Sequence, residues 1–207
     1  SEWSPGVDET TIKFATVIGP EVSEVDRRAM LGPLEAHVRD HNSQSRHEER
    51  RAQSGPFYKE EKFAPYRRYA LSVWELEGDP ETWGDQLQAY YAKEPVFALI
   101  GGIAEGSWAP IHQFCERNRI PSLFPVTDYP VISESDWYTL YFSRGLSQEG
   151  ETAAQFLKKR YESREMPAIL QLYRENSKGA LAAAGFSRRW QDSKLQGIPL
   201  PAKGAAG

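Results

Sequence analysis

The residues that could do chemistry gather in one short segment, residues 101–108, which reads Gly-Gly-Ile-Ala-Glu-Gly-Ser-Trp. Glycines let a backbone approach a ligand closely, and N–H groups at the start of a helix attract an anionic group such as a carboxylate. Glu105 and Ser107 add a carboxylate and a hydroxyl, and Trp108 adds a ring on which a ligand could lie. A plain strand-to-helix turn, with Trp108 packed in the core, is the alternative that the sequence leaves open.

Several catalytic and cofactor motifs are absent from the sequence. After Gly101 and Gly102 the next glycine is Gly106, so the segment does not have the G-x-G-x-x-G spacing of a dinucleotide-binding fingerprint. The Walker A phosphate-binding motif, G-x-x-x-x-G-K-[ST], does not occur in the sequence either. No G-x-S-x-G nucleophile elbow is present either. We therefore predict no cofactor and no enzymatic activity. The weaker alternative is an enzyme on a flavodoxin-like sheet that uses Glu105, Asp128 or His112 as an acid or base.

The histidines and the cysteine do not indicate a metal site. His37 and His41 are four residues apart, but the sequence between them lacks the glutamate that a zinc protease needs after its first histidine. We expect them on a solvated helix face. Cys115 is the one cysteine, so an internal disulfide and a Cys-based zinc site are both excluded. We expect it to be buried as a packing residue.

Length and composition narrow the class of protein. The 207 residues suffice for one domain or for one domain and part of a second, and 40% apolar residues can form a core. The net charge of -4 argues against a nucleic-acid partner, because phosphate binding needs a concentrated basic surface. The longest nearly uncharged apolar run, residues 95–104, is too short to span a bilayer, which takes about 20 residues. If the protein is exported, we expect that its signal has been removed, since no signal-peptide pattern begins the chain.

Strand-like apolar runs alternate with amphipathic runs, which is typical of an α/β protein with a three-layer, doubly wound, mostly parallel sheet. The pattern predicts strands over residues 12–18, 69–76, 96–100, 120–124, 137–143 and 168–173, and helices over residues 22–40, 79–91, 109–118, 149–161 and 180–191. Gly32 and Pro33 predict a kink or a restart in the first helix. The tail, residues 197–207, is expected to be loose.

Residues 43–68 do not fit this alternation. They hold eleven Arg, Lys or Glu residues and two Pro breakers, so we predict a long surface insertion. It is either a solvated excursion or a loop that docks a partner.

Ligands of open parallel sheets bind beyond the carboxyl ends of the strands. Five strand-to-helix junctions would lie there: residues 19–21, 77–79, 101–108, 125–129 and 144–148. We expect these junctions to gather at one rim and form a recess that holds a solute without altering it.

Three stretches carry a resemblance to a known family. They are residues 96–101 (VFALIG), residues 120–125 (IPSLFP), and residues 141–144 (YFSR) followed by a Gln-Glu-Gly run and two alanines. In this order they resemble the type I periplasmic binding proteins, specifically the branched-chain amino-acid receptors of ABC transporters. With weaker matches on either side, the resemblance covers roughly four-fifths of the chain.

The resemblance implies a ligand-binding lobe over residues 1–165, with the charged insertion 43–68. Residues 166–207 would begin a second lobe, or add a strand–helix unit with a loose tail. The implied function is an extracytoplasmic solute-binding protein, periplasmic or extracellular, that closes its cleft on a small polar ligand, of which an amino-acid-like molecule is one candidate. A membrane permease or another protein is the implied partner, without nucleic acid and without membrane insertion. A sensory or protein-docking domain of the same fold is the alternative.

The resemblance also implies ligand-binding residues, taken one at a time. The family often places a serine early in the loop after Ile-Gly, and that position falls at Glu105, with Ser107 two residues on. A threonine that the family has in the next junction corresponds to Thr127 or Asp128. The family commonly has an aromatic residue before a glycine in its second lobe, and this chain has Lys178 at that position. The amino-acid clamp of the family is therefore not intact. Glu105 and Asp128 suit a cationic or hydroxyl-bearing ligand, whereas Lys178 suits an anionic one. The predicted ligand-binding residues are Gly102, Glu105, Gly106, Ser107, Trp108, Thr127, Asp128, Tyr129 and Lys178.

Overall fold

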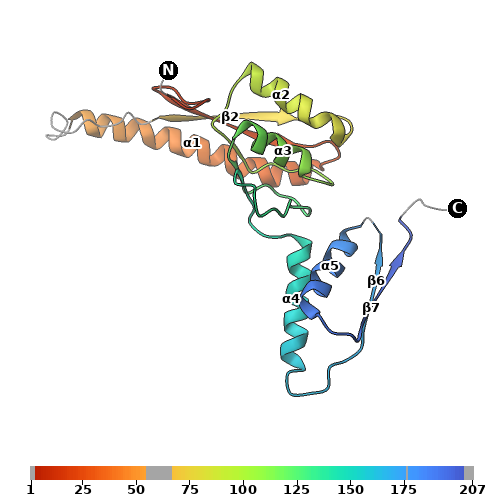
Figure 1. Cartoon of the computed structure of the whole chain (residues 1–207). Coiled ribbons are helices and arrows are strands. Elements are labelled where there is room, and N and C mark those ends of the chain that lie inside the picture. The colour runs from red at the N-terminus through yellow and green to blue at the C-terminus, as the bar shows by residue number, and fades with distance from the viewer. Residues whose placement is uncertain (1–2, 55–66, 176, 203–207) are drawn as a thin grey trace. The chain divides into compact units, whose positions relative to one another are not determined.

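The computed structural model describes residues 3–54, 67–175 and 177–202, all with their side chains except residues 45–54. The chain divides into two compact units (Figure 1). Unit 1 comprises Ser1–Thr127 and Val131–Phe142, and unit 2 comprises Asp128–Pro130 and Ser143–Gly207. In the part of the chain that is described, no helix is both long and apolar enough to cross a membrane.

Unit 1 is built on a five-stranded sheet in the order β2-β1-β3-β4-β5, and every pair of neighbours is parallel. This confirms the predicted α/β class. The strands are β1 (Thr11–Ile18), β2 (Arg68–Glu75), β3 (Ala98–Ile100), β4 (Ser122–Leu123) and β5 (Thr139–Leu140). The helical elements are α1 (Glu24–Ser54), the 3-10 turn η1 (Pro80–Thr82), α2 (Trp83–Lys93) and α3 (Ala109–Asn118).

The two faces of the sheet are covered by different helices. On one face, the Thr16 hydroxyl of β1 donates to the sulfur of Met30 on α1 at 3.5 Å. On the other face, Ala15 and Val17 belong to a core that includes Leu87 of α2 and Ile111 of α3. This alternation along β1 follows from the period of two in a strand, which sends successive side chains to opposite faces. Figure 1 shows α1 on one side of β2 and α2 on the other.

Helix α1 is longer than its sequence pattern predicted. It begins after Ser23, whose hydroxyl accepts the Asp26 N–H at 3.1 Å, and it runs through Pro33 to Ser54. The predicted restart at Pro33 is therefore wrong, because proline removes one backbone donor while good helix formers follow it. Residues 43–54, the first part of the predicted insertion, continue this helix. Residues 55–66 lie outside the described residues.

Two residues of α1 hold the helix against the first part of the edge strand β2. The Asn42 side chain donates to the Tyr69 carbonyl at 2.9 Å and accepts the Tyr69 N–H at 2.8 Å. The His41 ring stacks on the Tyr69 ring, with centroids 3.6 Å apart and planes within 7°. Because Asn42 satisfies both backbone groups of Tyr69, α1 caps the strand edge there.

Unit 2 pairs two helices with a small parallel sheet. The elements are α4 (Leu146–Arg160), β6 (Ile169–Arg174), α5 (Lys178–Trp190) and β7 (Leu195–Leu200). β6 and β7 pair in register from Ile169 with Leu195 to Arg174 with Leu200. The tail that was expected to be loose from residue 197 is therefore a strand as far as Leu200, and Pro199 is tolerated in it because β7 is an edge strand.

One helix of unit 2 was expected in the first lobe. The longer segment of unit 2 begins at Ser143 and includes α4, which packs closely on α5. A methyl group added at Gly150 would lie 1.9 Å from the Ala182 carbonyl oxygen, and one added at Gly185 would lie 1.9 Å from the Ser147 carbonyl oxygen. Two glycines therefore allow the backbones to touch.

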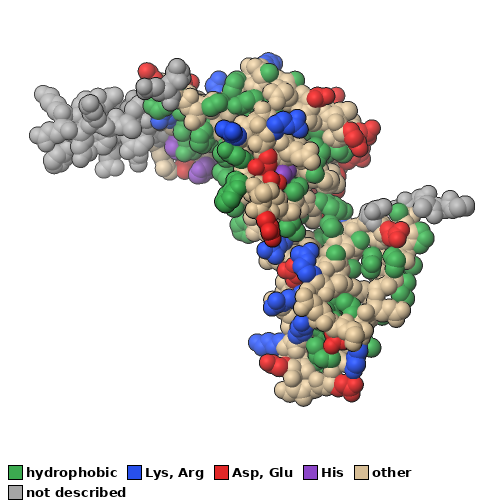
Figure 2. Space-filling view, in the orientation of Figure 1, with side chains coloured by type: hydrophobic (Ala, Val, Ile, Leu, Met, Phe, Trp, Pro, Cys, Tyr) green, Lys and Arg blue, Asp and Glu red, His purple; other side chains and the backbone are tan. Residues whose placement is uncertain are grey.

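The sheet of unit 2 is apolar on both faces. Ile169 and Leu195 pack on the core formed by Ala154, Phe186 and Trp190. Leu170 and Leu172 point the other way and are 61% and 65% exposed. Figure 2 shows hydrophobic side chains gathered over β6 and β7. Within the described part of unit 2, no layer covers this outer face, although parallel sheets are usually buried on both faces.

Candidate functional site

The strand order of unit 1 creates a point where ligands bind in open α/β sheets. Strand β1 lies between β2 and β3. The chain runs from β1 to β2 on one side of β1 and then crosses to β3 on the other side of β1, so the connections diverge between β1 and β3. Because all five strands are parallel, residues 19–21, 77–79 and 101–108 leave the sheet at the same carboxyl edge. The junction of residues 125–129 begins at this edge too, whereas residues 144–148 belong to unit 2.

The segment after β3 extends the sheet before it turns into α3. Gly101 and Gly102 have φ angles of +60° and +95°, which few L side chains adopt. The Ile103 N–H then donates to the Val17 carbonyl at 2.9 Å, and the Gly19 N–H donates to the Ile103 carbonyl at 2.8 Å. The segment is thus held by β1 beyond the end of β3, so its tip has a fixed position.

Trp108 lies beneath this segment. It is 1% exposed and belongs to the core of unit 1, so the structure agrees with core packing, the alternative that the sequence left open. A methyl group added at Gly102 would lie 2.9 Å from the Trp108 ring atom Cη2. Trp108 therefore supports the loop from below and presents no ring face at the surface of unit 1.

The exposed tip of the loop consists of Glu105, Gly106 and Ser107. The Ser107 hydroxyl accepts the Ala109 N–H at 3.2 Å, so it caps the first turn of α3 and keeps its own proton for another acceptor. Gly106 has a φ of +76° and nothing within 4 Å of the position of an added methyl group. The tip therefore offers a carboxylate, a hydroxyl and open space beside the backbone.

The remaining predicted residues are divided between the units. Thr127 is half-buried at the end of a segment of unit 1, whereas Asp128, Tyr129 and Lys178 belong to unit 2. The ammonium group of Lys178 forms an ion pair with the carboxylate of Asp128, and both side chains are about half exposed. The two residues that were expected to select ligands of opposite charge thus neutralise each other within unit 2.

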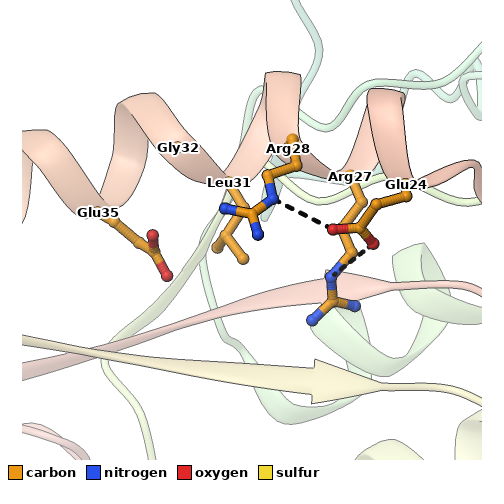
Figure 3. Close-up of a pocket in the computed structure, with 6 residues that line it drawn as sticks. All are labelled: Glu24, Arg27, Arg28, Leu31, Gly32 and Glu35. Atoms are coloured by element: carbon orange, nitrogen blue, oxygen red, sulfur yellow. Dashed lines mark hydrogen bonds and ion pairs between the residues drawn. The ribbon is translucent and has the colours of Figure 1, made fainter.

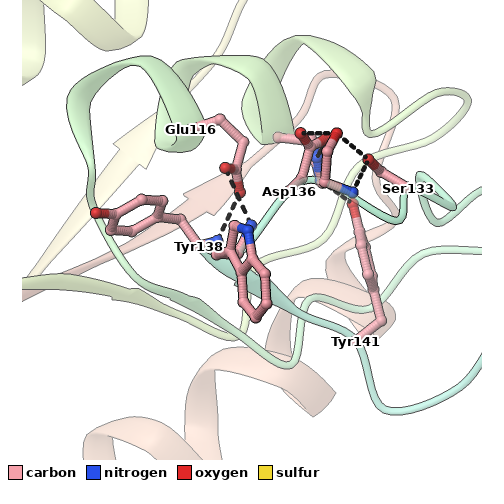
Figure 4. Close-up of polar contacts among 8 residues, drawn as sticks. Glu116, Ser133, Asp136, Tyr138 and Tyr141 are labelled. Atoms are coloured by element: carbon pink, nitrogen blue, oxygen red, sulfur yellow. Dashed lines mark hydrogen bonds and ion pairs between the residues drawn. The ribbon is translucent and has the colours of Figure 1, made fainter.

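His112 has a structural environment that the sequence did not reveal, and Figure 4 labels its partners Asp136 and Tyr141. Its ring is 3% exposed, with Nδ1 2.8 Å from the Tyr141 hydroxyl and Nε2 2.8 Å from an Asp136 carboxylate oxygen. Burial raises the pKa of Tyr141 to about 12, so the phenol keeps its proton and can donate it to Nδ1. Both ring nitrogens are then engaged inside the fold, which leaves His112 no free nitrogen for acid–base chemistry on a substrate.

A neighbouring carboxylate holds the same part of unit 1. Glu116 of α3 accepts the backbone N–H groups of Trp137 and Tyr138 at 3.2 and 2.6 Å, as the dashed lines of Figure 4 show. Together with Asp136, it fixes the segment before β5 to α3. No spacing in the sequence indicates this, because the contacts cross more than 20 residues.

Cys115 and the other candidate ligands whose side chains the structure describes form no metal centre. Burial raises the pKa of the Cys115 thiol to about 12, so it stays protonated and packs as an apolar residue, as expected. Within the described ranges, no group of three or more His, Cys, Asp or Glu residues is placed to hold a metal ion.

We expect Asp136→Asn to lower the stability of unit 1 in a pH-dependent way. The hydrogen bond from His112 lowers the pKa of Asp136 below its usual value of 3.8. The stabilisation is therefore present above pH 3.8 and is lost as the pH falls through the lower pKa of the folded state. Thermal unfolding at several pH values should show a lower midpoint for the variant at pH 7, and the difference should shrink in acid.

The control for this experiment is Asp79→Asn, because the Asp79 side chain makes no capping hydrogen bond. It should leave the midpoint near that of the wild type at every pH. An Asp136→Asn midpoint equal to the wild type at neutral pH would show that the contact with His112 does not stabilise the fold.

Comparison with known proteins identifies the fold. No protein-family model matches the sequence, and a search of curated proteins finds no match. A leucine-binding protein of Thermotoga maritima is 14% identical with a TM-score of 0.58 over 94% of this chain and 50% of that one. An ABC transporter substrate-binding protein of Desulfitobacterium hafniense in complex with Leu is 13% identical with a TM-score of 0.60 over 95% and 52%.

A fatty acid ABC transporter substrate-binding protein of Thermomonospora curvata is 18% identical, with a TM-score of 0.56 over 98% of this chain and 47% of that one. These likenesses show that the chain has the fold of the type I periplasmic binding proteins, as the sequence predicted. The chain spans about half the length of these structures.

Proposed function

We propose that the chain is part of an extracytoplasmic solute-binding receptor of the ABC-transporter type. In this proposal it binds a small polar molecule at the carboxyl edge of the five-stranded sheet and does not transform it. The observation that carries the proposal is the exposed tip of Glu105, Gly106 and Ser107. The segment that carries this tip follows β3 and is hydrogen-bonded to the end of β1, at the point where the chain connections diverge.

Binding without catalysis is favoured by what surrounds the tip. The acid–base groups nearest in the sequence, His112 and Cys115, are buried and serve packing and internal hydrogen bonds. Proteins of the same fold include a substrate-binding protein in complex with Leu and the substrate-binding protein of a fatty acid ABC transporter. The fold therefore does not determine the ligand, which depends on the residues at the site. The Glu105 carboxylate and the Ser107 hydroxyl suit a ligand with ammonium or hydroxyl groups.

The finer parts of the proposal concern unit 2 and the setting of the protein. We propose Thr127, Asp128, Tyr129 and Lys178 as further ligand contacts of a receptor that closes its cleft on the bound molecule. The ion pair of Asp128 and Lys178 is about half exposed. A ligand that carries both a positive and a negative charge could therefore replace it, with its positive group at Asp128 and its negative group at Lys178. The receptor would work in the periplasm or outside the cell and deliver its ligand to a membrane permease.

We expect one member of a panel of polar solutes to raise the midpoint of thermal unfolding. A ligand that binds the folded state stabilises it by about 2.7 kcal/mol at a concentration 100 times its Kd. Glu105→Ala should remove the gain, because the ligand loses its carboxylate partner. The measurement is a thermal-shift screen followed by titration calorimetry of each hit.

The matched control is Glu9→Ala, which removes an exposed carboxylate just before β1, at the opposite edge of the same sheet. It should keep the full ligand-induced shift. A shift that survives in Glu105→Ala would place the binding site elsewhere, and a panel of polar solutes without any hit would contradict the proposed function.

A further inference from the structure

We infer that unit 1 holds a second, separate site, which binds a phosphoryl group or a similar tetrahedral oxyanion between α1 and β2. A cavity of about 350 Å³ lies there, lined by Arg39, Asn42, Ser43 and Arg68. Two arginines, an asparagine and a serine line it, and none of these lining residues carries a carboxylate. A cationic cavity of this kind stands out on a chain whose net charge is -4.

The backbones that carry the two arginines are held rigidly. Asn42, three residues after Arg39, makes its two hydrogen bonds to the backbone of Tyr69, which directly follows Arg68. The Arg68 N–H itself donates to the Thr10 carbonyl at 2.8 Å. The fold therefore fixes the separation of the two arginine backbones before any ligand arrives, which reduces the entropy lost on binding.

These arginines differ from others on the same helix. At the first turns of α1, the Glu24 carboxylate lies 3.2 Å from the Arg28 side chain and 3.9 Å from the Arg27 side chain (Figure 3). Arg27 also forms an ion pair with Glu75. By contrast, the guanidinium groups of Arg39 and Arg68 make no ion pair or hydrogen bond with any residue that the structure describes. Their charge is thus left for a ligand.

The chemistry of the cavity selects the ligand class. A guanidinium group presents planar pairs of N–H donors that match two oxygens of a phosphate, and two such groups can hold three or four oxygens. The Ser43 hydroxyl can donate one hydrogen bond more. The volume exceeds that of inorganic phosphate, so a phosphate monoester with a small organic part also fits.

The cavity is well separated from the proposed solute site. Arg68 is the first residue of β2, whose eight residues run from the amino edge to the carboxyl edge of the sheet. At about 3.3 Å per residue, the strand places the two edges roughly 23 Å apart. Occupation of one site therefore does not require the other, and the two can be tested independently.

The test is titration calorimetry of the full chain with inorganic phosphate and with glycerol 3-phosphate, at constant ionic strength set with sodium chloride. We expect saturable one-to-one binding of at least one of them. Arg39→Gln and Arg68→Gln should each weaken the affinity about tenfold or more, as loss of a charge-assisted hydrogen bond does, and the double variant should not bind. Binding of both probes indicates a site for the phosphoryl group itself, whereas binding of the ester alone shows that the organic part contributes.

Two controls separate this site from a general effect of positive charge. Arg28→Gln removes a paired arginine of the same helix and should bind phosphate like the wild type. Arg68→Lys keeps the charge but loses the planar donor pair, so its affinity should lie between those of the wild type and Arg68→Gln. Circular dichroism establishes that each variant is folded.

The inference would be overturned if neither probe bound at millimolar concentration, or if the folded double variant bound as tightly as the wild type. It would also fail if Arg28→Gln weakened binding as much as Arg39→Gln. Glu105→Ala should retain phosphate binding, so failure of the proposed solute site would leave this result unaffected.

Discussion

Gly150→Ala is expected to disrupt the helix pair of unit 2, although alanine favours a helix over glycine by about 1 kcal/mol. Gly150 lies in α4 where its backbone touches α5, and an added methyl group would be 1.9 Å from the Ala182 carbonyl oxygen. The obstacle is a backbone atom, which cannot turn aside as a flexible side chain can. Overpacking of this kind costs about 1–3 kcal/mol or more. This cost exceeds the gain in helix propensity, so the substitution should lower the stability of unit 2.

Hydrogen exchange followed by peptide mass measurement can locate this effect. Amides of α4 and α5 should lose protection in Gly150→Ala, while those of α3 in unit 1 should keep it. The matched control is Gly179→Ala in α5, where the nearest atom to the added methyl group is 3.5 Å away. Gly179→Ala should be neutral or stabilising. Unchanged protection in Gly150→Ala would mean that α4 and α5 do not pack as closely as described.

Gly102→Ala should destabilise unit 1 by about 3 kcal/mol. A φ of +95° is strained for alanine by about 1–2 kcal/mol, and the added methyl group meets the Trp108 ring at 2.9 Å and the Val17 carbonyl oxygen at 3.0 Å. Because Trp108 is a buried core residue, the ring has little room to move. The strain therefore falls on the loop that carries the proposed ligand-binding tip.

Gly106→Ala separates the two causes. Its φ of +76° imposes similar backbone strain, but nothing lies within 4 Å of the added methyl group. We expect a loss of about 1–2 kcal/mol from the strain alone. Urea unfolding, followed by the fluorescence of the buried tryptophans of unit 1, measures both variants. Equal losses would show that Gly102 is not packed against Trp108.

Local patterns predicted the elements whose signals are local. The helix of residues 109–118 and the strand of residues 12–18 match α3 and β1 within a residue, because each has clear breakers and an apolar pattern of its own. The length of α1 was missed because the many charged residues from position 43 onwards indicated a surface insertion, whereas the first of them continue the helix. The strand β7 was missed because its pairing with β6 is a distant contact.

Side-chain placement was harder to predict than the loop that carries it. The tip of residues 105–107 is exposed and follows β3, as its position between a strand and a helix indicated. The sequence could not decide which way Trp108 turns, since either face of a short helix start can point to the core. Nor could it show the contact of Asp128 with Lys178 or of His112 with Asp136, because these pairs are 50 and 24 residues apart.

The most direct test of the proposed receptor is amide chemical-shift mapping of the isotope-labelled chain during titration with the solute that gives the largest thermal shift. We predict that the amides of Gly102, Glu105, Gly106 and Ser107 shift together and saturate with the Kd found by calorimetry. Shifts confined to other surfaces, such as the amino edge around Arg68, or a solute that stabilises the protein without moving these amides, would contradict the account.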